Sequence, residues 1–144
     1  MKVAIASDHG GFTLKKTVLD VLKTLHISYE DLGCDSEESV DYPDFAEAVA
    51  RKVSTGKADR GILLCGTGAG MAIVANKFKG IRAAVAADSY TARMIREHND
   101  ANVLALGGRV LDSKKVAEIV KLFIETPFAG GRHERRVKKI KEFE

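Results

Sequence analysis

The chain has 144 residues, of which 45% are hydrophobic, and this length suits one domain with a buried core. Its 23 lysines and arginines are interspersed with 20 aspartates and glutamates, and the net charge of +3 does not imply a nucleic-acid partner. The longest apolar runs, such as 103–106, are far shorter than the roughly 18 residues that a membrane span requires, so no membrane partner is expected.

The start of the chain and its cysteines predict a cellular location. Residues 2–6 already have the pattern of a strand, with no leader segment and cleavage site before them. Cys34 and Cys65 do not form a Cys-x-x-Cys pair, and the four histidines have no zinc-ligand spacing. The sequence therefore predicts a cytoplasmic protein without a disulfide or a metal, in which a cysteine is inert unless its surroundings indicate otherwise.

Short apolar runs alternate with amphipathic segments along the chain. Strands are predicted at 3–6, 27–32, 62–65, 83–87 and 103–106. Helices are predicted at 12–25, from Pro43 to about 53, at 71–77, at 90–97 and at 114–125, and a basic helix at about 134–143 follows Pro127, Gly130 and Gly131. This alternation predicts a doubly wound parallel sheet with helices on both faces, in a single domain over 1–144.

Polar residues follow the first predicted strand, at the edge where ligands bind in such sheets. Asp8 and His9 precede Gly10 and Gly11, which allow a tight turn, and they could form an acid/base pair. The alternative is that Asp8 caps the following helix and His9 is a solvated turn residue. Taken alone, this segment favours the alternative.

A glycine-rich segment, Cys65-Gly66-Thr67-Gly68-Ala69-Gly70, follows the third strand and leads into a helix. Its backbone N–H groups could converge on an anion, and a helix N-terminus favours the thiolate form of Cys65, a candidate base or nucleophile. A packing turn with an inert thiol is an equally good interpretation. Met71 replaces the third glycine of the dinucleotide-binding fingerprint, and no P-loop lysine follows, so no nucleotide cofactor is predicted.

Two further groups of polar residues come later in the chain. His98 and Asn99 follow the fourth predicted helix, where the imidazole could be a general acid or could only complement the helix dipole. Arg109 follows the fifth strand, and Arg132 and Arg136 share a face of the C-terminal helix. These arginines could bind one phosphate or belong to an ordinary solvated basic tail.

Together these segments closely resemble the type B ribose-5-phosphate isomerase family, over essentially the whole chain. The motifs that carry the resemblance are Ser7-Asp8-His9-Gly10-Gly11, Asp41-Tyr42-Pro43, Cys65-Gly66-Thr67-Gly68-Ala69-Gly70, Asn76-Lys77, His98-Asn99-Asp100-Ala101-Asn102-Val103, Gly107-Gly108-Arg109 and Gly130-Gly131-Arg132-His133-Glu134-Arg135-Arg136. The resemblance implies a Rossmann-like three-layer α/β/α fold. It also implies interconversion of ribose 5-phosphate and ribulose 5-phosphate, in the pentose phosphate pathway, without a metal or other cofactor.

The resemblance also implies a role for each site residue. Cys65 would be the base that moves a proton between C1 and C2, and His98 the acid that opens the furanose ring. Backbone N–H groups of residues 66–70 would stabilise the enediolate, Thr67 would bond the thiol or the substrate, and Asp8 would accept a proton during ring opening. The sugar oxygens would be bound by Asp8, His9, Tyr42 and Asn99, and the phosphate by Arg109, Arg132 and Arg136.

The resemblance further implies a homodimer, which could pair into a tetramer, with the site shared between subunits and the helix at about 132–143 in the site or the interface. One family branch carries a glutamate base where Met71 stands, so this chain resembles the cysteine branch. The alternatives are an isomerase of allose 6-phosphate, or a galactose-6-phosphate isomerase subunit, although the catalytic set is complete in one chain here. A last alternative is a non-catalytic module that binds phosphate or nucleic acid.

Overall fold

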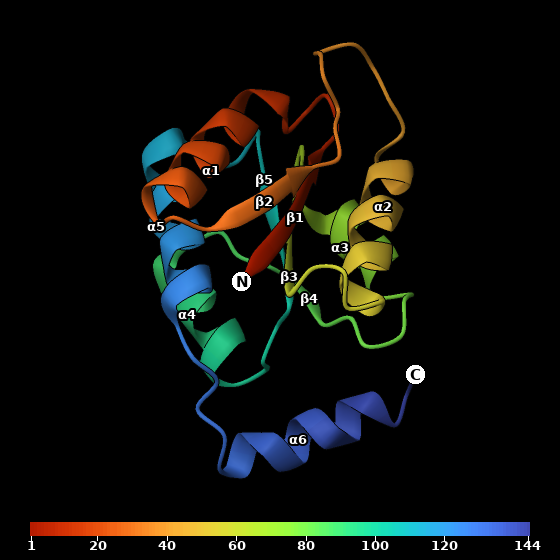
Figure 1. The fold of residues 1–144 in the computed structure, drawn as a ribbon, viewed down its shortest axis with the longest axis vertical. Helices are drawn as coiled ribbons and strands as arrows, with labels where there is room; N and C mark the ends of the chain where they lie inside the picture. The colour runs from red at the N-terminus through yellow and green to blue at the C-terminus, as the bar shows by residue number, and fades with distance from the viewer.

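The computed structural model describes all 144 residues and places a parallel sheet between two layers of helices (Figure 1). The strands are β1 (Lys2–Ser7), β2 (Ser28–Asp31), β3 (Arg60–Cys65), β4 (Ala83–Val85) and β5 (Val103–Gly107). The helices are α1 (Phe12–Thr24), α2 (Tyr42–Ser54), α3 (Ala69–Ala75), α4 (Ser89–Glu97), α5 (Ser113–Glu125) and α6 (Arg132–Lys141). None of them combines the length and the apolar character that crossing a bilayer would need.

The strand order β2-β1-β3-β5-β4 confirms the predicted doubly wound sheet. All four neighbouring pairs are parallel, so every strand has its carboxyl end at the same edge. After β1 the chain runs to β2, which lies on one flank of the β1–β3 pair. After β3 it runs to β4 and β5, which lie on the other flank, so the winding changes direction between β1 and β3. Ligands of such sheets bind at this switch point, beyond the carboxyl ends of β1 and β3.

The two faces of the sheet bury different side chains, because successive residues of a strand point in opposite directions. Leu64 of β3 packs with α1, α4 and α5, where Phe123 is fully buried. Leu63 and Cys65 face the other layer and pack with α2 and α3, against residues such as Met71. The alternation along β3 therefore points the Cys65 side chain toward α2 and α3.

Several element boundaries differ from those predicted, among them those of α3, β4 and α6. α3 begins at Ala69 rather than 71, because Gly68, with a φ of +84°, ends the loop directly before Ala69. β4 ends at Val85 rather than 87, and Asp88 then caps α4 by accepting a hydrogen bond from the Thr91 N–H (2.7 Å). α6 begins at 132 rather than 134, because the positive φ of Gly131 (+55°) turns the chain directly into the helix. It ends at 141 rather than 143.

α6 crosses the end of the sheet that lies opposite the carboxyl ends of the strands (Figure 1). Before the helix, the Ala129 N–H donates to the Glu97 carbonyl at the end of α4 (3.1 Å). After the helix, a carboxylate oxygen of Glu144 accepts from the Gly80 N–H (3.0 Å). Glu97 and Gly80 each precede a strand, so both ends of α6 are tied to the amino edge of the sheet.

Candidate active site

Three loops meet around Cys65 at the carboxyl edge. The loop after β1 touches the loop after β3, since a Cβ added to Gly10 would lie 3.0 Å from the Gly66 nitrogen. The loop after β5 joins them, because the Gly108 N–H donates to the Cys65 carbonyl (2.7 Å) and the Arg109 N–H to the Gly66 carbonyl (3.0 Å). Only glycine fits at position 108, where a Cβ would collide with the Gly10 carbonyl oxygen.

The Cys65 thiol is buried, with the residue 5% exposed, and it accepts a hydrogen bond. The donor is the backbone N–H of Gly68, 3.1 Å from Sγ, and such a donor favours negative charge on the sulfur. Thr67 was predicted to bond the Cys65 thiol or the substrate, and it makes no hydrogen bond to the thiol. Its Oγ1 accepts from the Ala69 N–H (3.3 Å), and Thr67 is exposed.

The loop after β3 has several N–H groups free to bind an anion. Those of Gly66, Thr67 and Gly70 have no acceptor within the chain. The Arg109 guanidinium lies beside this loop, with Nη1 3.4 Å from the position that a Cβ on Gly66 would take. N–H donors and a positive charge beside a thiol suit a negatively charged oxygen that forms next to a reacting carbon.

Asp8 and His9 line the β1 side of the same edge. Asp8 is buried, and its Oδ1 accepts from the Gly11 N–H (3.1 Å) in the turn before α1. Because α1 has no side-chain cap, the alternative that Asp8 caps this helix is wrong. The second oxygen of Asp8 has no partner within the chain. The Val40 N–H donates to Nδ1 of His9 (3.2 Å), so a neutral His9 carries its proton on Nε2 and presents a donor there.

Tyr42, the first residue of α2, completes this group. Its ring lies against Gly70, where an added Cβ would be only 2.7 Å from the ring atoms Cε2 and Cζ. The carboxyl-edge group thus consists of Asp8, His9, Tyr42, the segment 65–70 and Arg109. No three His, Cys, Asp or Glu side chains converge there or elsewhere in a way that could hold a metal ion.

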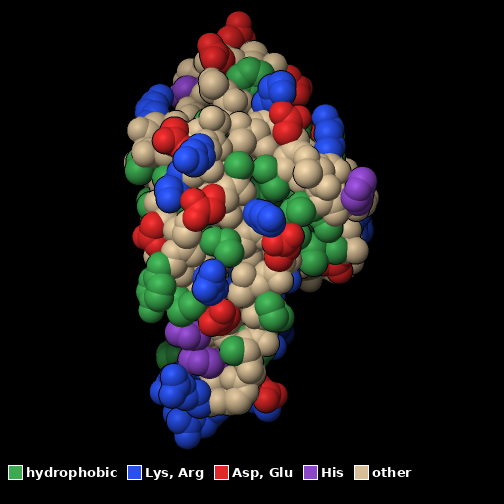
Figure 2. Space-filling view, turned by 90° about the vertical axis from the view of Figure 1, so that its left-hand side faces the viewer, with side chains coloured by type: hydrophobic (Ala, Val, Ile, Leu, Met, Phe, Trp, Pro, Cys, Tyr) green, Lys and Arg blue, Asp and Glu red, His purple; other side chains and the backbone are tan.

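A second group, the amino-edge group, lies at the opposite edge of the sheet and consists of His98, Asn99, Arg132 and Arg136. His98 caps the end of α4, and its ring stacks on His133 of α6 with 4.2 Å between centroids and 13° between planes. Arg132 and Arg136 are exposed on α6. Figure 2 shows Lys and Arg side chains gathered over this helix, beside histidine side chains.

His133 is a member of the amino-edge group that the sequence analysis missed. It lies in the motif at residues 130–136, but a histidine between Arg132 and Arg136 looks like any residue of a solvated basic tail. In the structure, partial burial lowers the pKa of His133, and the charges of His98, Arg132 and Arg136 add to the lowering. A lowered pKa keeps His133 neutral at neutral pH, so it can stack on His98 without adding a charge.

One chain does not bring the two groups together. β5 has five residues and runs from the amino edge to the carboxyl edge, a length of about 16 Å at about 3.3 Å per residue. A five-carbon sugar phosphate is too short to contact both groups of one chain. Arg109 therefore lies too far from Arg132 and Arg136 of the same chain for the three to bind one phosphate. The prediction that they do so, in a site shared between subunits, requires a second copy of the chain.

Comparisons with known proteins identify relatives over the whole chain. Residues 3–140 match the family model described as Ribose/Galactose Isomerase. The ribose-5-phosphate isomerase B of Escherichia coli is 44% identical over 143 residues, which cover 99% of this chain and 96% of that protein. The solved ribose-5-phosphate isomerase B of Clostridium thermocellum matches with a TM-score of 0.97 and 53% identity, over 99% of this chain and 97% of that one. The Mycoplasma genitalium ribose-5-phosphate isomerase B, solved with bound ribulose-5-phosphate, matches with a TM-score of 0.94 and 44% identity, over 99% of this chain and 95% of that one.

Proposed function

Because the chain belongs to the ribose/galactose isomerase family, we propose that it is an aldose–ketose isomerase that interconverts ribose 5-phosphate and ribulose 5-phosphate, a step of the pentose phosphate pathway. The observation that carries the proposal is the Cys65 thiol, which is buried at the switch point beside N–H groups without acceptors. Relatives named ribose-5-phosphate isomerase B, one of them with ribulose-5-phosphate bound, support the choice of substrate. Residues 1–144 would act as one domain.

Cys65 is the proposed base. Its thiolate removes the proton from C2 of the open-chain aldose, and the electron pair of that bond moves through C1 onto the carbonyl oxygen. The enediolate that forms is stabilised by the free N–H groups of the loop after β3 and by the Thr67 hydroxyl. A proton then passes from the C2 oxygen to the C1 oxygen, which moves the negative charge to the C2 oxygen. The thiol returns its proton to C1 as the C2–O bond becomes a carbonyl, which gives the ketose and regenerates the thiolate. Burial of Cys65 strengthens the attraction between the enediolate and these N–H groups, because charges interact more strongly where water is scarce.

The amino-edge group is proposed to act on the same sugar from a second copy of the chain. His98 of one copy donates a proton to the ring oxygen, while Asp8 of the other accepts the C1 hydroxyl proton, which opens the ring. Arg109 of one copy and the Arg132–Arg136 pair of the other would hold the phosphate through charge-assisted bonds. The sugar oxygens would be bound by Asp8, His9 and Tyr42 of one copy and Asn99 of the other.

The surface at the amino edge supports this pairing of two copies. A hollow of about 410 Å³ lies there, lined by Asn99 and by the apolar side chains of Phe78, Ile140 and Phe143. Phe143 is 92% exposed in one chain, and apolar surface of this kind marks contact sites. The proposed assembly is a homodimer, with a tetramer as a further option. The free, buried cysteines support a reducing compartment and hence the cytoplasm.

The first test is an isomerase assay of the purified protein in EDTA, with ribose 5-phosphate and allose 6-phosphate as alternative substrates. We expect rapid formation of ribulose 5-phosphate. Turnover of the hexose alone would keep the mechanism and replace the substrate. Activity that needs added divalent metal would contradict the metal-free reaction. No turnover of either sugar would contradict the isomerase, and strongly salt-dependent binding of oligonucleotides would then favour the binding module.

Replacing Gly70 by alanine should displace the Tyr42 ring and lower kcat/KM for ribose 5-phosphate about tenfold, since a ligand contact is lost without any change in the thiol. The reason is the 2.7 Å approach that a Cβ would make to the ring. Kinetics of Gly70→Ala, Tyr42→Ala and the double variant check this. The double variant should be no worse than Tyr42→Ala, because both changes remove the same contact. Additive losses would show that Gly70 acts in another way.

A further inference from the structure

The turn that follows α4 contains a residue in an uncommon conformation. Asp100 comes two residues after His98 and takes a φ of +46°, in the left-handed region that residues other than glycine seldom adopt. The Ala101 N–H donates to the Ile95 carbonyl (2.9 Å) and closes the turn. A residue in this conformation needs support from its surroundings. Whatever holds Asp100 therefore also holds His98 and Asn99, the residues just before it.

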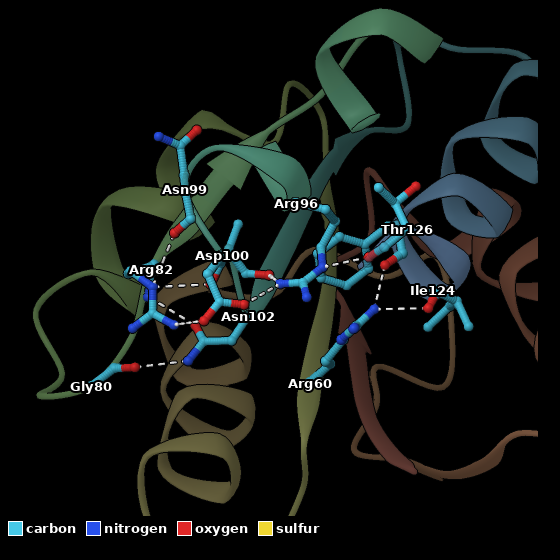
Figure 3. Close-up of polar contacts among 11 residues, drawn as sticks. Arg60, Gly80, Arg82, Arg96, Asn99, Asp100, Asn102, Ile124 and Thr126 are labelled. Carbon is cyan, nitrogen blue, oxygen red and sulfur yellow. Dashed lines mark hydrogen bonds and ion pairs between the residues drawn. The ribbon is translucent and has the colours of Figure 1, made fainter. Parts of the chain in front are cut away.

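Two arginines supply this support (Figure 3). Arg82, just before β4, donates from Nη2 to Oδ2 of Asp100 (3.1 Å) and from Nε to the carbonyls of Asn99 (3.1 Å) and Asp100 (3.0 Å). Arg96, in the last turn of α4, donates from Nη1 to Oδ1 of Asp100 (2.9 Å) and to the Ala101 carbonyl (2.6 Å). The carboxylate orients both guanidinium groups, and these hold the carbonyls of the turn.

The Asp100 cluster, formed by Arg82, Arg96 and Asp100, buries its two arginine side chains. Those of Arg96 and Arg82 are 6% and 12% exposed, whereas that of Asp100 is 35% exposed. Arg60 adds another guanidinium nearby, and burial, followed by the charge of Arg96, lowers the pKa of Arg60 to about 10. Without Asp100, both arginines would lose the carboxylate that they contact. Because the two guanidinium groups are buried, loss of their shared carboxylate is more disruptive than loss of a surface pair.

The cluster supports the turn from its backbone side and leaves the site side chains free. The Asn99 side chain points away from the cluster (Figure 3). No hydrogen bond joins the cluster to the His98 side chain, which instead stacks on His133. Arg96 also donates to the Thr126 carbonyl (3.3 Å), so the cluster connects this turn to the segment that leads into α6. The His98 ring thus takes its position from a backbone that the cluster holds.

We propose that Asp100 is a positioning residue for the ring-opening acid, which acts through Arg82 and Arg96 and does not touch the substrate. This inference rests on the proposed function, because it assigns to the cluster the placement of His98 at the sugar ring. Loss of the carboxylate should slow ring opening. It should change substrate affinity little, because no hydrogen bond or ion pair joins the cluster to Arg109, Arg132 or Arg136, the proposed phosphate ligands.

The test is Asp100→Asn, which keeps the shape of the side chain and removes its charge. We expect kcat for ribose 5-phosphate to fall about 30-fold, with KM within about threefold of wild type, since misplacing a catalytic group by about 1 Å can cost about 100-fold. In a His98→Asn background the same change should have an effect of less than about twofold, because no acid is left to position. Asp20→Asn, which removes an ion-paired aspartate on α1, is the matched control and should keep wild-type kinetics.

Several results would overturn the proposal. One is a wild-type kcat for Asp100→Asn, and another is an equally large loss when His98 is already replaced. If thermal unfolding shows that Asp100→Asn is not folded, Arg82→Lys takes its place, because lysine keeps the charge but cannot bond the carboxylate and two carbonyls together. It should lower kcat only when His98 is present, and an unchanged kcat would overturn the proposal. Failure of the proposed function is a separate result, since the wild-type protein would not isomerise ribose 5-phosphate.

Discussion

Replacing Cys65 by alanine should lower kcat for ribose 5-phosphate by about 1000-fold, which corresponds to about 4 kcal/mol of transition-state stabilisation. Alanine lacks the proton acceptor that the mechanism needs, and it leaves the Gly68 N–H without the sulfur 3.1 Å away. The fold should survive, because a small apolar residue still fills the buried position. Initial rates of ketose formation and the thermal unfolding temperature, measured on the same preparation, check both expectations.

Cys34 provides the matched control for this substitution. It is also a free cysteine that is 5% exposed, but its Sγ contacts Oγ of Ser7 (3.8 Å) and the carbonyl of Ser36 (3.3 Å) instead of the glycine-rich loop. Cys34→Ala should keep kcat within about threefold of wild type, since it changes packing away from the reacting carbons. Similar losses in both variants would indicate a packing defect. A Cys65→Ala variant within about tenfold of wild type would mean that another group is the base.

Mixing two inactive variants, Cys65→Ala and His98→Asn, should restore about one quarter of wild-type activity. In a two-fold symmetric dimer with shared sites, each site takes Cys65 from one chain and His98 from the other. A mixed dimer then contains one intact site and one site that lacks both groups. Random pairing of equal amounts makes about half of all dimers mixed, which gives the expected quarter. Co-refolding at several mixing ratios, followed by the isomerase assay, measures the recovery.

The control for this experiment mixes Cys65→Ala with a chain that carries both substitutions. No dimer of that mixture contains a complete site, so no activity should return. If Cys65 and His98 instead served the same chain, mixed dimers of the two single variants would have no intact site either. Activity that stays at the level of the separate variants would therefore contradict the shared site, even though the isomerase activity itself would stand.

The sheet could be predicted from the sequence because its strands are buried on both faces. Ile62, Leu63 and Leu64 are consecutive and point alternately to the two helical layers, yet all are fully buried. Such continuous apolar runs between amphipathic segments are typical of parallel strands. The helix starts were less predictable, because Gly68 and Gly131 take positive φ values that a glycine allows but does not impose.

The carboxyl-edge group could also be predicted, since parallel strands bring their carboxyl ends together whatever the loops contain. Asp8 after β1, Cys65 after β3 and Arg109 after β5 therefore had to lie near one another. The positions of the amino-edge residues could not be predicted from strand order alone. His98 precedes a strand, and α6, which carries Arg132, follows the last strand, so its location depends on where the chain turns after α5.

The fold class and the loop that carries the proposed base could be predicted without a structure, because hydrophobic periodicity reports burial along one element at a time. The three-dimensional structure was needed to show that Gly68, and not Thr67, donates to the thiol, and that Asp100 lies between two arginines. It alone placed α6 across the amino edge. The physical reason is that these contacts join segments far apart along the chain, and their distances are set by how the packed layers close on one another.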